Sequence, residues 1–186
     1  MRRILFVLGL LPLGFAAGGC NSNPLGDAQQ PNVVDTIVLG ALVGTSIGTP
    51  SAFSIPASAA VRTDQTSQFD FAYNIESGSR HVFLPQGALG ISNTSGVSPG
   101  LLLSDQSFNE ITEAPLNGYN TIDTITIAVN QVWVARSSLV CTSVGVPVYA
   151  KLRILSFDDV NREVKFEVLA NRNCGFRELT PGIPQN

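Results

Sequence analysis

Residues 149–170 read YAKLRILSFDDVNREVKFEVLA and give the clearest structural signal in the chain. Two apolar runs, 149–157 and 164–170, flank the polar segment DDVNRE. In the second run every other residue is apolar, as in a strand that buries one face. These apolar residues are Val164, Phe166, Val168 and Ala170. The stretch therefore predicts an antiparallel hairpin, with Asp158 and Asp159 as turn residues rather than a catalytic pair of carboxylates.

The same alternation occurs earlier in the chain. Phe69, Phe71 and Tyr73 alternate with Asp70 and Ala72. A strand with this sequence carries three aromatic rings on one face and Asp70 on the other. We expect the aromatic face to form part of the core.

Three further segments complete the secondary-structure prediction. Residues 124–134 indicate a strand or a strand pair, and residues 36–48 indicate a strand followed by a glycine-rich loop. One helix signal competes with the strands, because Ser104 precedes apolar residues at helical spacing and Pro115 ends the pattern. The predicted fold class is all-β, with one short helix of a turn or two.

The composition fits one exported β-rich domain. The chain has 186 residues, of which 44% are hydrophobic and 13% are charged, and its formal net charge is −3. The negative charge disfavours a basic nucleic-acid binder, and the apolar content disfavours disorder. We expect a single domain over residues 34–186 and no nucleic-acid partner.

The first twenty residues follow the plan of an export signal. Arg2 and Arg3 precede the apolar run 4–15, and the small residues 16–19 precede Cys20. The apolar run is short for a transmembrane helix, which needs about 20 residues. Its ending resembles the lipobox of bacterial lipoproteins. We expect residues 1–19 to be removed and Cys20 to carry acyl chains such as palmitate, with ordinary secretion as the alternative.

Residues 20–33 are expected to form the lipidated N-terminus and a flexible tether. The segment after Cys20 is rich in Asn, Gln, Pro and Gly and shows no apolar periodicity. Asn21 occupies the position where Asp favours inner-membrane retention, so the resemblance to sorted lipoproteins implies the outer membrane. The predicted location is the bacterial cell envelope, anchored by lipid, with the membrane face left open.

Two cysteines remain in the predicted domain. Cys141 precedes the first arm of the hairpin and Cys174 follows the second. An even pair in an oxidising compartment predicts a disulfide, which would join the loop leading into the hairpin to the loop leading out. A metal site would need more ligands than these cysteines and the single histidine.

Six segments between about Ala52 and Leu179 occur in the order found in one family of lipoproteins. They are 69–73 (FDFAY), 86–88 (QGA), 108–119, 132–136 (VWVAR), 148–157 (VYAKLRILSF) and 164–168 (VKFEV). Together they resemble the HmuY family of bacterial haem-binding lipoproteins, although Phe69 stands where that family has Trp. The resemblance implies a sandwich of antiparallel sheets outside the cell with an exposed cleft that holds haem.

The haem ligands of that family are only partly present. Characterised members hold the iron between two axial side chains, two His or, in relatives, Met. The chain has one His and one Met, and Met1 leaves with the leader, so neither pair can form within one chain. A one-sided site remains open, with His81 as the iron ligand, Tyr73 or Tyr119 beside it, and Arg80 on a haem propionate. The alternative is that His81 and Arg80 are solvated and the two tyrosines are packing residues.

Two functions of different class follow from the sequence. The first is a non-catalytic lipoprotein that captures haem or a similar flat apolar ligand at the cell surface and passes it to an outer-membrane receptor. The second is a structural or interaction lipoprotein that keeps the scaffold and binds a protein or glycan partner but no haem. An enzyme is not expected, because a lone His81 without a nucleophile motif offers no catalytic triad.

Overall fold

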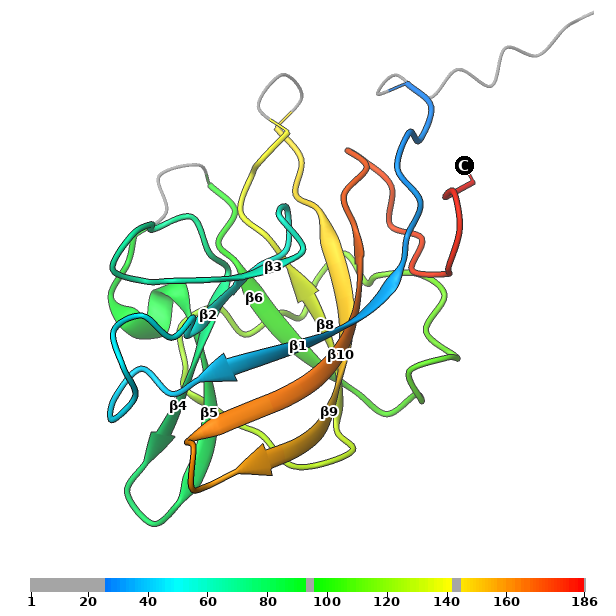
Figure 1. The fold of residues 1–186 in the computed structure, drawn as a ribbon. Helices are drawn as coiled ribbons and strands as arrows, with labels where there is room; N and C mark the ends of the chain where they lie inside the picture. The colour runs from blue at the N-terminus through cyan, green and yellow to red at the C-terminus, as the bar shows by residue number, and fades with distance from the viewer. Residues whose placement is uncertain (1–25, 93–95, 142–144, 186) are drawn as a thin grey trace, which may run out of the picture.

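The computed structural model describes residues 26–92, 96–141 and 145–185, which form two five-stranded antiparallel sheets (Figure 1). The first sheet has the order β1 (Val34–Gly40), β10 (Glu163–Asn171), β9 (Tyr149–Asp158), β8 (Val132–Arg136) and β6 (Gly100–Ser104). The second has the order β3 (Ala59–Val61), β2 (Ala52–Ser54), β4 (Phe71–Glu76), β5 (Arg80–Pro85) and β7 (Ile125–Thr126). The prediction of an all-β fold of antiparallel sheets is confirmed.

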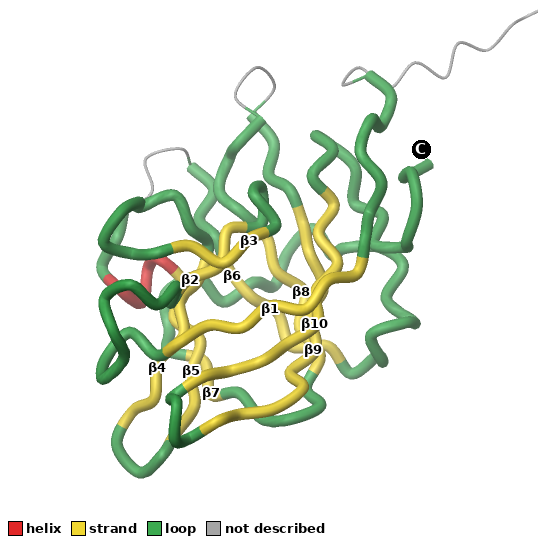
Figure 2. The backbone as a smooth tube through the Cα atoms, viewed as in Figure 1, coloured by secondary structure: helices red, strands yellow, loops and turns green. Residues whose placement is uncertain are grey.

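Helical structure within the described ranges is limited to the 3-10 helix η1 (Gln86–Leu89), drawn in red in Figure 2. Over these same ranges, no helix has the length and apolar character needed to cross a membrane.

The hairpin predicted from residues 149–170 is present as β9 and β10. Glu163 pairs with Asp158 at the turn, and the pairing continues to Asn171 and Tyr149 at the other end. The carboxylate of Asp158 accepts the backbone N–H groups of Val160 and Asn161 at 3.0 and 2.9 Å, which closes the turn. The hairpin lies at the centre of the first sheet, because β1 pairs with β10 and β8 pairs with β9.

The main core lies between the two sheets. Phe166 of β10 is fully buried and contacts three rings from the second sheet, with ring centroids 5.7 to 6.2 Å apart. The three rings belong to Phe53, Phe71 and Phe83. Aromatic pairs at these distances contribute about 0.5–1.5 kcal/mol each beyond the apolar area they bury. The inward residues of β10 that the alternation predicted are all buried in this core.

The helix expected after Ser104 does not form. Residues 104–120 instead run across the outer face of the first sheet, where Phe108 and Ile111 join a second buried cluster. The buried ammonium of Lys151 donates a hydrogen bond to the Ile111 carbonyl at 2.9 Å, and Nζ lies 4.7 Å from the centre of the Phe108 ring. The backbone of residues 112–114, just after Ile111, also pairs with residues 177–179. These tertiary bonds take the backbone groups that a helix would use internally.

Of the three aromatic residues expected on one face of β4, only Phe71 and Tyr73 lie there. Phe69 precedes the strand and packs in a separate cluster with Ala52 and Ala72. Both faces of the strand are therefore covered at this end, which a simple alternation does not anticipate.

The remaining strand predictions agree with the structure in outline. Residues 34–40 form β1 and are followed by a loop, as the glycine pattern indicated. Residues 124–134 contain two strands, but β7 has only two residues and belongs to the second sheet, whereas β8 belongs to the first. Val129 between them is exposed.

The ordered domain begins before β1. Gln29 and Gln30 donate backbone N–H groups to the Asn173 side-chain carbonyl at 2.8 and 2.9 Å. Asn32 is buried and pairs with Gly182 through two backbone hydrogen bonds. The last residues of the segment assigned to a tether are thus bound to the domain.

Candidate functional site

His81 and Tyr73 face each other across the β4–β5 pair. The turn between these strands contains Gly78 and Ser79, both with positive φ, which brings β5 back antiparallel to β4. The turn of the β9–β10 hairpin lies on the opposite sheet at the same end of the sandwich (Figure 1). This arrangement places His81 between the two sheets.

Every polar atom of the His81 ring has a partner. The Tyr73 hydroxyl lies 2.7 Å from Nδ1, and the Asp159 carboxylate lies 3.3 Å from Nε2. The Phe157 ring stacks on the imidazole, with centroids 3.7 Å apart and planes 6° from parallel. Only 12% of the histidine side chain is exposed. Because Asp159 offers only acceptor atoms, its contact favours the tautomer with the proton on Nε2, in which Nδ1 accepts the hydrogen bond from the Tyr73 hydroxyl.

Burial dominates the electrostatics of this cluster. Burial lowers the pKa of His81, and the nearby Asp159 carboxylate opposes that shift. Burial raises the pKa of the Tyr73 hydroxyl, and Asp159 raises it further. Both groups are therefore neutral at pH 7. The Tyr73–His81 hydrogen bond lies within the second sheet, and the Asp159 contact and the Phe157 ring connect His81 to the first sheet.

The other two candidate residues do not join His81. Arg80 is paired with Glu76 on the neighbouring strand and is half exposed. Tyr119 lies on the outer side of the first sheet, where its hydroxyl donates to the Pro115 carbonyl at 2.7 Å. The Arg136 guanidinium lies 4.7 Å from the centre of the Tyr119 ring. Tyr119 is thus a packing residue with a satisfied hydroxyl.

These residues do not fit haem. An iron ligand needs a free imidazole nitrogen facing a slot, whereas the Nε2 atom of His81 faces Asp159 and the ring face is covered by Phe157. The Tyr73 side chain is fully buried and engaged with His81. Iron could reach His81 only if the β9–β10 turn moved away.

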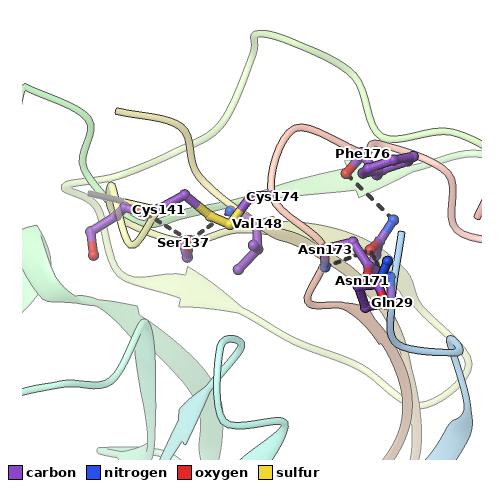
Figure 3. Close-up of a disulfide and its surroundings, with 9 residues drawn as sticks. Gln29, Ser137, Cys141, Val148, Asn171, Asn173, Cys174 and Phe176 are labelled. Atoms are coloured by element: carbon purple, nitrogen blue, oxygen red, sulfur yellow. Dashed lines mark hydrogen bonds between the residues drawn. A yellow bond between two sulfur atoms is a disulfide. The ribbon is translucent and has the colours of Figure 1, made fainter. Parts of the chain in front are cut away.

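The predicted disulfide between Cys141 and Cys174 is present, with Cα atoms 5.8 Å apart. As Figure 3 shows, it lies beside the Asn171 and Asn173 side chains, which organise the chain after β10. Asn173 also holds Gln29, so the disulfide and the N-terminal segment meet at one end of the domain. Cys20, the predicted lipidation site, lies outside the described residues.

Sequence reasoning missed Asp70. The alternation assigned it to the face opposite the aromatic rings, but only 4% of the residue is exposed. Its carboxylate accepts the Ile55 backbone N–H at 2.7 Å. The one available signal was an acidic residue flanked by Phe69 and Phe71 at the start of a strongly apolar strand.

No protein-family model, curated protein or solved structure matches the chain. In the ranges that the structure describes, no group of three or more His, Cys, Asp or Glu side chains is placed to hold a metal ion.

Proposed function

We propose that the protein is a lipid-anchored, non-catalytic binding protein of the bacterial cell envelope. The observation that carries the proposal is the leader that ends at Cys20, followed by a disulfide-containing β-sandwich. The N-terminal segment joins the domain beside Asn173, whereas the β9–β10 turn lies at the far end of the seven-residue strand β1. An anchor at Cys20 would therefore leave the β9–β10 end facing away from the membrane.

The anchor is tested by fractionation. The wild-type chain is expected in the membrane fraction, labelled by radioactive palmitate, when it is expressed in a bacterium with a lipoprotein pathway. Cys20→Ala removes the thiol that acylation requires, so this variant is expected to lose the label and leave the membranes after salt washing. A variant that keeps the label, or a wild-type chain that is never labelled, contradicts the proposal.

Between the two functional hypotheses, the geometry favours binding without haem. The resemblance to the HmuY family supports an exported sandwich with a binding role, but the partners of His81 speak against iron coordination. A haemin titration followed in the Soret region is expected to show no saturable shift that depends on His81. The wild type and His81→Ala should therefore give the same result. A one-to-one shift lost in His81→Ala would restore haem as the ligand.

A further inference from the structure

A cavity of about 410 Å³ lies at the end of the sandwich away from His81. Small-molecule sites span roughly 300–1,000 Å³, so the space suits a compact ligand. Its wall joins the two sheets, because it is formed by β2 and the turn after it, the chain entering β4, the start of η1, and the loop after β8. The lining residues are Ser54, Pro56, Ser67, Gln68, Phe69, Asp70, Gln86, Ser138, Leu139 and Val140.

Asp70 gives this cavity a buried carboxyl that has no cationic partner among the residues the structure describes. The carboxylate accepts hydrogen bonds from the backbone N–H groups of Ile55 and Ser138, and it is almost fully buried. Among the described residues that line the cavity, Asp70 is the only titratable side chain. Burial raises the pKa of this carboxyl to about 7, and the two amides only partly oppose the shift. Above about pH 7 the carboxyl is mainly ionised, and a buried carboxylate is ordinarily paired with a cation, which a ligand in this cavity would supply.

The rest of the wall restricts what that cation can be. The lining combines hydroxyl and amide side chains, such as Ser54, Ser67 and Gln68, with the apolar residues Phe69 and Leu139. A calcium ion would need six to eight oxygen ligands, more than one carboxylate can organise, and an anion would be repelled by Asp70. A primary ammonium suits the site better, because it donates three hydrogen bonds and is carried on an apolar or hydroxylated body.

Hydrogen bonds and the disulfide restrain the segments on both sides of Asp70. The buried Gln86 side chain donates its amide to the carbonyls of Ser67 and Phe69, at 3.0 and 2.6 Å. On the other side, the disulfide follows directly after Val140 and ties that loop to Cys174. The carboxylate is thus held between two fixed segments. This arrangement lowers the entropic cost of ordering the site when a ligand binds.

We propose that this cavity binds a small organic ammonium compound, with the Asp70 carboxylate as the anchoring group. The inference rests on the proposed binding function but not on the lipid anchor. It assigns a ligand class that differs from haem in charge and shape, at a place remote from His81.

Three compounds that share one ring test the charge requirement. Tyramine carries an ammonium, 4-ethylphenol carries no charge, and 4-hydroxyphenylacetate carries a carboxylate. We expect calorimetric titration of the full-length chain in detergent at pH 8 to show saturable one-to-one binding of tyramine. The other two compounds are expected to bind at least tenfold more weakly. Equal binding of all three, or no saturable binding of tyramine, overturns the inference.

Variants locate the site. Asp70→Asn keeps an oxygen acceptor for the Ile55 amide but removes the charge, so it is expected to abolish the preference for tyramine. Ser67→Trp places a large side chain at the exposed edge of the cavity and is expected to weaken tyramine binding at least tenfold with Asp70 intact. Asp123→Asn removes an exposed carboxylate elsewhere and serves as the matched control. Tyramine binding unchanged in Ser67→Trp overturns the inference even if Asp70→Asn fails to fold.

The fractionation experiment separates this inference from the proposed function. A chain that is membrane-anchored but does not bind tyramine overturns only the ligand class. A chain that binds tyramine in wild-type and Cys20→Ala forms alike, but is never found with membranes, overturns only the anchor.

Discussion

Two ionisable side chains lie at opposite ends of the β4–β5 pair, in different surroundings. His81 has a partner for each ring nitrogen and an aromatic ring against its face. Asp70, one residue before β4, has backbone amides for partners and a cavity beside it. A side chain suited to ligand chemistry is available for it only where the fold leaves its charge or its lone pairs without a partner. His81, the residue that the sequence predicted to bind a ligand, already has partners within the protein.

The largest effect that would test this comparison is the pH dependence of stability at Asp70. Burial raises the pKa of this carboxyl from 3.8, its ordinary value, to about 7 in the folded chain. Between these values the folded chain binds more protons than the unfolded chain, so stability is fully present below pH 3.8 and is lost as pH rises to 7. The expected loss is roughly 1.4 kcal/mol per pH unit, or about 4 kcal/mol in all.

The measurement is urea unfolding at pH 4, 5.5 and 7 for the wild type and Asp70→Asn. The variant should become relatively more stable as pH rises, whereas Asp123→Asn should follow the wild type. Parallel curves for wild type and Asp70→Asn would mean that the carboxylate is solvated and that the cavity end has no unbalanced charge.

Removing the disulfide is expected to destabilise the chain by about 3 to 4 kcal/mol, because the bridge spans a sequence separation of 33 residues. The bridge follows Val140 in the cavity wall and is remote from His81. The Cys141→Ala, Cys174→Ala double variant should therefore lower both unfolding free energy and tyramine affinity, and it should leave the His81 NMR signal unchanged. A shifted His81 signal with unchanged tyramine affinity would mean that the disulfide supports the surroundings of His81 and not the cavity wall.

The sequence predicted the framework of the fold from local periodicity but not the partners of its ionisable groups. Residues 164–168 alternate between apolar and charged side chains, and the hairpin formed as expected. The helix signal after Ser104 was weak enough to be overridden by the bond from Lys151 to Ile111, a contact across 40 residues. The partner of His81 across the sandwich, Asp159, is likewise distant in sequence, so no local pattern could reveal it. Asp70 was misplaced because alternation assumes one solvated face, and Phe69 helps to cover that face at this end.

Deleting the Tyr73 hydroxyl tests the end of the sandwich at which Tyr73, His81 and Asp159 meet. Tyr73→Phe keeps the ring in the core but leaves Nδ1 of His81 without its donor. The expected cost is about 1–2 kcal/mol, the desolvation penalty of a buried acceptor that has lost its partner. Chemical unfolding at pH 7.5 measures it, with Tyr119→Phe, whose hydroxyl bonds the Pro115 carbonyl nearer the surface, as the comparison. A Tyr73→Phe chain as stable as the wild type would mean that water or another group reaches His81.

The smallest expected effect, and the sharpest, is on the pKa of His81. Burial lowers this pKa and Asp159 raises it, so Asp159→Asn should lower it further. The chain has one histidine, so a single imidazole resonance reports the titration without assignment by mutagenesis. Because the folded pKa lies below the unfolded value of 6.5, His81 contributes stability that is present above pH 6.5 and lost as pH falls below it. Stability contributed by His81 therefore increases with pH, because the folded state favours the neutral imidazole. The contribution of Asp70 has the opposite sign and decreases as pH rises. If the His81 pKa rises in Asp159→Asn, or equals that of a solvated imidazole in the wild type, the ring is open to solvent and haem coordination becomes geometrically possible again.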